Sequence, residues 1–144
     1  MINVNLGDIE PIAYCIVIKE LLDSNRFLKG FGDNILMKFQ IKEIEENIRK
    51  IRRELLSNIE NKKHFTGIKT LLLDLLDRVL SMSGRYSSIN YALTSELQNN
   101  IKKIIKNVAN SESFEDLQKL YEEFNRNVFL VVYKLFQESL SLRK

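Results

Sequence analysis

Apolar residues recur at regular intervals between positions 37 and 55 of this chain. The intervals are four, three, four, three and four residues, and the apolar residues are Met37, Ile41, Ile44, Ile48, Ile51 and Leu55. Charged and polar residues fill the positions between them. A seven-residue repeat with two apolar positions is typical of one helix packed lengthwise against another. We therefore predict a long amphipathic helix here, with its apolar seam against a neighbouring helix.

Helical spacing of apolar residues continues in four other segments of the chain. Two segments, 67–83 and 88–109, show one apolar face each, whereas the segment 10–23 is apolar on nearly every side. The run Ile16 to Ile18 is β-branched and also suits a buried strand, but the residues up to Asp23 continue the helical pattern, so we favour a helix. The predicted helices cover residues 10–23, 34–61, 67–83, 88–109 and 114–142.

Short polar signals mark the ends of several of these helices. Ser113 followed by Asp116 forms a capping box for the last helix. Ser87 or Ser88 is expected to begin the fourth helix. Gly84 stands just after the third helix, where a left-handed C-terminal residue favours glycine.

Composition and connection length determine the predicted fold class. The 144 residues include five glycines and one proline, too few for a fold rich in tight turns. Short connections make consecutive helices antiparallel. With 44% hydrophobic residues, no internal repeat and no linker, we predict an all-α, single-domain bundle of about five helices over residues 1–144, antiparallel and elongated.

Cysteine usage and hydropathy indicate where such a protein works. The single cysteine, Cys15, excludes an internal disulfide and lies in an apolar run. The longest apolar run, Ile12 to Ile18, is far shorter than the ~20 residues that cross a bilayer. Residues 1–8 lack the basic start of a signal peptide. We expect a cytoplasmic protein without a membrane span.

The sequence offers no residues for catalysis. It has no glycine-rich phosphate loop and no nucleophile elbow, and one histidine with one cysteine does not make a metal site. His64 follows two lysines in a predicted loop, and Asp74 and Asp77 fit a solvated helix face near Arg78. We therefore expect no catalytic residues, no metal and no cofactor, and a protein that is not an enzyme.

Positive charge is concentrated in the middle of the chain. The net charge is +3, but residues 49–106 hold twelve Lys or Arg against five Asp or Glu. Two helices carry the clusters that are candidates for nucleic-acid binding: Arg49, Lys50 and Arg53, and Lys102, Lys103 and Lys106. These residues either form a stripe that neutralises phosphates or are the solvated faces of amphipathic helices. Few aromatics lie near them, so the first interpretation implies contact with the backbone and no reading of bases.

Two segments of the chain are apolar on all sides, although a bundle of five helices surrounds only one helix completely. The segment 10–23 and the part 128–133 of the last helix are both apolar on all sides, which suggests either a surface for another chain or two helices that cross in the core. In the first interpretation aromatic side chains would anchor the partner. The candidate anchors are Tyr14, Phe129, Tyr133 and Phe136.

These observations predict a function in binding. The leading hypothesis is a non-catalytic helical subunit, an interaction module of a larger complex that binds a protein partner or a second copy of itself. An association of this subunit with nucleic acid is compatible with that role. The alternative is a protein that binds the phosphate backbone of nucleic acid without sequence preference. An enzyme with an unrecognised site is the least supported hypothesis.

Overall fold

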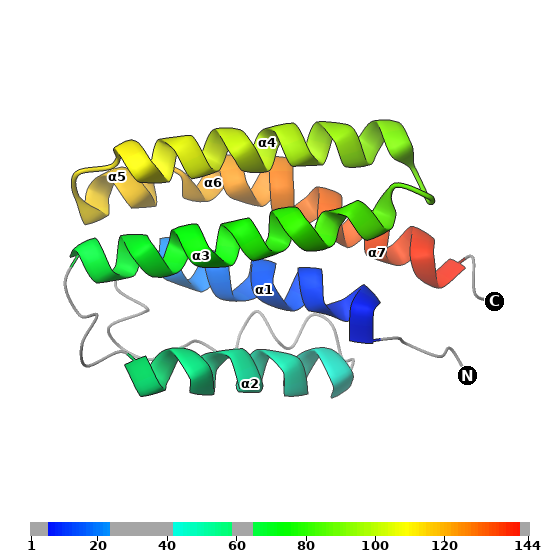
Figure 1. Ribbon diagram of the computed structural model, residues 1–144, viewed down its shortest axis with the longest axis horizontal. Helices are drawn as coiled ribbons and strands as arrows, with labels where there is room; N and C mark the ends of the chain where they lie inside the picture. Colours follow the sequence, from blue (N-terminus) through cyan, green and yellow to red (C-terminus); the bar gives the residue numbers. More distant parts are fainter. Residues whose placement is uncertain (1–5, 24–41, 59–64, 142–144) are drawn as a thin grey trace.

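The computed structural model describes residues 6–23, 42–58 and 65–141, which form helices and short turns with no strand among them (Figure 1). This confirms the predicted all-α fold. The elements are α1 (Leu6–Leu22), α2 (Lys42–Asn58), α3 (Phe65–Ser83), the 3₁₀ turn η4 (Gly84–Tyr86), α4 (Tyr91–Asn110), α5 (Phe114–Gln118), α6 (Tyr121–Phe124), the π-helical turn η5 (Asn125–Phe129) and α7 (Leu130–Ser141).

Four helical rods form an antiparallel bundle, and α2 packs on its outside. In Figure 1, α3 runs opposite to α1 and α4 runs opposite to α3, while the continuous rod of α6, η5 and α7 lies behind them. That rod contacts both α1 and α4, which closes the bundle. The predicted antiparallel arrangement is therefore present in these four rods.

Helix α2 is the exception, because it runs parallel to its neighbour α1. Ile9 and Glu43 line one end of the groove between the two helices, and Glu20 contacts Arg52 near the other end. Nineteen residues separate Leu22 from Lys42. A chain of that length spans up to ~60 Å when extended, whereas the 17 residues of α2 rise only ~26 Å. The connection is thus long enough for α2 to start at the same end of the bundle as α1.

Helix α1 is the centre of the core. Its side chains from Ile9 to Leu22 are buried, apart from Glu10 and Tyr14, which are half-buried. The reason is that α1 contacts α2 on one side and α3 and the α6–α7 rod on the others. The all-round apolar pattern of this segment is therefore explained by a position inside the molecule.

The other helices bury one face each. In α2 the predicted seam residues Ile44, Ile48 and Ile51 are at most 3% exposed. Met37 and Ile41 of the predicted seam lie outside the described residues, as do residues 34–41 and 59–61 of the predicted helix. In α4 the buried side chains, Leu97 and Ile101 among them, follow the same helical spacing.

The ends of α3 and α4 differ in part from the predictions. Helix α3 ends at Ser83, as expected, but Gly84 enters a 3₁₀ turn and does not adopt a left-handed conformation. Helix α4 starts after Asn90, and not at Ser87 or Ser88, because the Asn90 side chain accepts a hydrogen bond from the Leu93 N–H at 3.0 Å.

The last predicted helix begins as expected but is interrupted. Ser113 accepts a hydrogen bond from the Asp116 N–H at 3.2 Å, while the Asp116 carboxylate accepts one from the Glu112 N–H at 2.9 Å. Helix α5 ends at Gln118, and the rod resumes at Tyr121. The π turn η5 adds a residue to one turn, and both Val128 and Phe129 are buried there.

Candidate binding surfaces on helices α2 and α4

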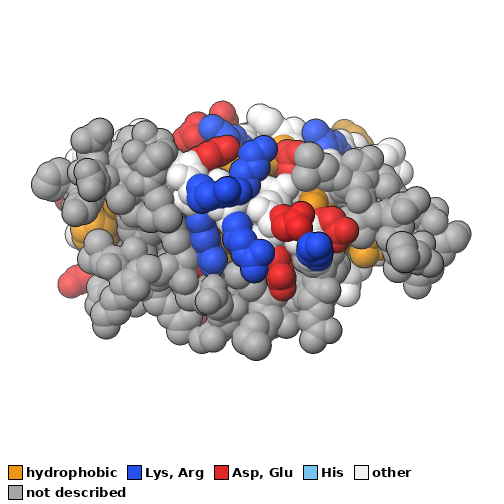
Figure 2. Space-filling view, turned by 90° about the horizontal axis from the view of Figure 1, so that it is seen from below, with side chains coloured by type: hydrophobic (Ala, Val, Ile, Leu, Met, Phe, Trp, Pro, Cys, Tyr) orange, Lys and Arg blue, Asp and Glu red, His pale blue; other side chains and the backbone are white. Residues whose placement is uncertain are grey.

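The exposed face of α2 carries four of the five basic residues of this helix. Opposite the buried seam, the exposed residues Lys42, Glu46, Arg49, Lys50 and Arg53 share one side of the helix. We call this set the α2 basic face. Figure 2 looks at the molecule from the α2 side and shows Lys and Arg side chains gathered near the middle of this surface, with acidic side chains at their edge. Helical phase alone brings these residues together, because they are spaced three or four apart.

Three of the four cations of the α2 basic face have no partner among the described residues. Lys42 forms an ion pair with Glu46 at 3.9 Å. The side chains of Arg49, Lys50 and Arg53 form no ion pair or hydrogen bond within residues 6–23, 42–58 and 65–141. A hollow of about 490 Å³ lies beside Arg49 and Arg53. The face therefore presents three exposed cations, beside a hollow that Glu46 and Arg52 also line.

Arg52 belongs to the interior instead. Its guanidinium forms a two-point contact with the Glu20 carboxylate, with Nε at 3.3 Å from Oε2 and Nη2 on Oε1. The Arg52 side chain is 11% exposed and the Glu20 side chain 1%. A guanidinium matches a carboxylate in this forked geometry and satisfies both oxygens. The pair joins α1 to α2 and holds Arg49 and Arg53 outward.

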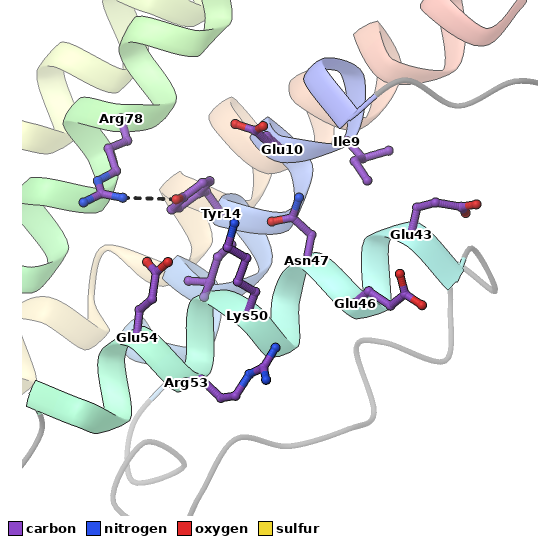
Figure 3. Close-up of a pocket in the computed structure, with 11 residues that line it drawn as sticks. Ile9, Glu10, Tyr14, Glu43, Glu46, Asn47, Lys50, Arg53, Glu54 and Arg78 are labelled. Carbon is purple, nitrogen blue, oxygen red and sulfur yellow. Dashed lines mark hydrogen bonds between the residues drawn. The ribbon is translucent and has the colours of Figure 1, made fainter.

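An open cleft of about 590 Å³ lies between α1, α2 and α3. At its wall, Arg78 Nη1 donates a hydrogen bond to the Tyr14 hydroxyl at 3.1 Å (Figure 3). An Asp74 carboxylate oxygen lies 3.3 Å from Arg78 Nε. The hydrogen bond with Tyr14, and secondarily the Asp74 charge, raise the pKa of the Arg78 guanidinium, which stays protonated. Tyr14 is half-buried, and its hydroxyl is already hydrogen-bonded to Arg78 of the same chain.

The cleft has mixed charge and does not suit an anion. Four acidic residues line it together with three basic ones: Glu10, Glu43, Glu46, Glu54, Lys50, Arg53 and Arg78. Figure 3 shows Lys50 extending toward Tyr14 and Arg53 extending to the other side of α2. Lys50 and Arg53 thus both lie at the border between the cleft and the α2 basic face, and Arg53 also lines the hollow beside Arg49.

The structure places the predicted aromatic anchors mainly in the core. Phe129 and Phe136 are 7% and 1% exposed, and Tyr133 is half-buried and stacked on Phe129 with ring centroids 6.5 Å apart. The rod that carries them contacts α1. In this arrangement the two apolar segments cover each other, so Phe129 and Phe136 lie in the core, and their role as anchors for a partner stays a prediction.

The second basic cluster lies on α4, at the opposite edge of the molecule from α2 (Figure 1). Lys102, Lys103 and Lys106 are all exposed and share the side of α4 that faces away from the bundle. We call them the α4 lysine face. Lys103 lies 3.8 Å from Glu123. Because α1 and α3 stand between α2 and α4, the two clusters do not form one continuous stripe.

Two charged residues of α1 were not singled out from the sequence. Lys19 and Glu20 are 8% and 1% exposed. Glu20 binds Arg52, and Lys19 Nζ lies 4.2 Å from the ring centroid of Phe129, over the aromatic face. The sequence contained a signal for their burial, because a helix that is apolar on all sides has no solvated face on which Lys19 and Glu20 could lie.

The described residues contain no group of three His, Cys, Asp or Glu side chains placed to hold a metal ion. His64 lies outside the described residues. None of the helices in the described part of the chain combines the length and the hydrophobicity needed to cross a bilayer.

The chain matches no protein family, and comparisons with curated proteins and with solved structures gave no match.

Proposed function

We propose that this protein works by binding, as a non-catalytic helical subunit, and that the α2 basic face contacts the phosphate backbone of nucleic acid. The observation that carries the proposal is the set of three exposed cations, Arg49, Lys50 and Arg53, without partners among the described residues. Phosphates are the acceptors that such cations bind, and their neutralisation releases counterions from the nucleic acid.

The placement of the arginines favours contact with phosphate. Arg49 and Arg53 are one helical turn apart, so their guanidinium groups project from the same side of α2 within ~6 Å along the axis. A guanidinium donates a planar pair of hydrogen bonds that matches phosphate oxygens. The buried Arg52–Glu20 pair holds α2 against α1, so the cations project from a fixed helix.

The α2 basic face supports binding without sequence preference. Its five residues include no aromatic side chain on which a base could stack, and we assign its arginines to phosphates and not to guanine edges. The hypothesis of a protein partner rested on an apolar surface, and the structure directs Phe129 and Phe136 into the core. We therefore base the proposed function on the basic face.

The test is the salt dependence of binding to a short labelled DNA duplex, measured by fluorescence anisotropy between 50 and 200 mM salt. The logarithm of the affinity should fall with the logarithm of the salt concentration with a slope of about −3, for three contacts. Combining Arg49→Gln with Arg53→Gln should weaken binding and reduce this slope by about 2.

The matched control removes two exposed cations elsewhere, Arg85 and Lys134, as Arg85→Gln with Lys134→Gln. It should leave the slope unchanged. An equal loss in both variants would mean that binding follows net charge and not the α2 basic face. Absence of binding to the duplex and to its single strands at 50 mM salt would refute the proposal.

A further inference from the structure

We infer that one molecule bridges two separate segments of nucleic acid, with the α2 basic face on one and the α4 lysine face on the other. This inference rests on the proposed function, because it requires that the α2 basic face binds phosphate. It goes further by assigning a second contact surface and an architectural role.

The two faces point away from each other. The buried side chains of α4, Leu97, Ile101 and Ile104 among them, face the bundle, so Lys102 and Lys106 face outward. The seam residues of α2 face α1, so Arg49 and Arg53 point to the other side. Figure 1 shows α2 and α4 as the two outer edges, with α1 and α3 between them.

The charge of α4 supports a second contact. Glu96 is the one acidic residue of this helix. The side chains of Lys102 and Lys106 have no ion pair or hydrogen bond within the described part of the chain. Lys103 and Glu123 form an exposed pair at 3.8 Å, and such pairs contribute little and are screened by salt.

One stiff ligand does not reach both faces. Duplex DNA has a persistence length of about 150 base pairs, so a duplex does not bend around a single bundle of this size without a large deformation cost. Occupation of both faces therefore brings two duplex segments to one molecule, on opposite sides of α1 and α3.

The test is a capture assay with two duplexes of the same sequence, one fixed to beads and one labelled in solution. Protein is added below the amount that saturates the beads, so that each molecule has access to both duplexes. The wild-type protein should retain the labelled duplex on the beads. Two variants should lose this capture: Arg49→Gln with Arg53→Gln, and Lys102→Gln with Lys106→Gln. The Arg85→Gln, Lys134→Gln variant should capture as the wild type does.

Anisotropy with a single duplex, run beside the capture assay, separates the two ways of failing. If the protein binds a duplex but does not capture a second one, the bridging inference is wrong and the proposed function stands. If no duplex is bound, both are wrong. If the Lys102→Gln, Lys106→Gln variant captures as well as the wild type, bridging occurs through two copies of the α2 basic face, which also overturns the inference. Light scattering would then show a dimer.

Discussion

Arg52 and Arg53 are adjacent in the sequence and have opposite environments. Successive residues of a helix are rotated by ~100° about its axis, so one arginine reaches the Glu20 carboxylate of α1 and the other projects outward. The same residue type thus stabilises the fold at position 52 and is exposed for binding at position 53. The chemical type of these residues does not determine their roles; their helical phase does.

Gly84 allows a prediction at the residue scale. It lies in a 3₁₀ turn without a left-handed conformation, and a Cβ at this position would meet no atom within 4 Å. Gly84→Ala should therefore stabilise the protein by about 0.4–1 kcal/mol, because alanine reduces the conformational entropy of the unfolded chain. Urea denaturation followed by circular dichroism measures the change. A loss of stability would show that this turn requires glycine.

At the scale of elements, the attachment of α2 to α1 depends on a buried charged pair. Among the described helices, α2 packs mainly against α1, through the buried residues Ile44, Ile48 and Ile51. The Arg52–Glu20 pair lies next to these residues. A one-turn shift of α2 along α1 would separate Arg52 from Glu20 and leave both charges in an apolar environment. The pair therefore fixes the register of two parallel helices.

Arg52→Met tests this attachment, with Arg53→Met as the matched control on the same helix. Removing the guanidinium from the buried Glu20 carboxylate should cost about 3–5 kcal/mol in the free energy of unfolding. The control should change it by no more than about 0.5 kcal/mol, because Arg53 is exposed. Hydrogen exchange should also show faster exchange in α2 than in α3 of the Arg52→Met protein. Equal effects of the two substitutions would contradict the role of the pair.

At the scale of the whole molecule, α1 is the central helix. The thiol of its Cys15 is shielded from solvent because α2, α3 and the rod of α6, η5 and α7 surround α1. Cys15 is fully buried, and desolvation raises the pKa of its thiol far above the ordinary value of 9.0, although the charge of Lys19 opposes the shift. The folded protein therefore keeps this proton at pH values where the unfolded chain releases it.

The consequence is a loss of stability at alkaline pH. Above about pH 9, unfolding releases the Cys15 proton, so the free energy of unfolding contributed by this group falls as the pH rises, by up to ~1.4 kcal/mol per pH unit. Cys15→Ala lacks this group, while the lysines and tyrosines that also titrate are common to both proteins. The stability difference between wild type and variant, measured by denaturation from pH 7 to 10.5, should shift against the wild type above pH 9. A constant difference would mean that Cys15 is accessible to solvent in the native state.

The local pattern of the sequence was sufficient to predict the helices and their buried faces. Apolar spacing marked Ile44, Ile48 and Ile51, and the capping serine Ser113 lies where the pattern placed it. The same spacing indicated that Arg49 and Arg53 share an exposed side of one helix. These features depend on residues within a few turns of each other, so the sequence by itself determines them.

Only the tertiary structure decided how those helices are placed relative to one another. The parallel pairing of α1 with α2, the burial of Glu20 by Arg52 and the covering of Phe136 by the core all join residues far apart in the chain. The separation of the α2 basic face from the α4 lysine face has the same origin. Periodicity shows which side of a helix is buried, but not which helix buries it, because that choice depends on the packing of all the helices together.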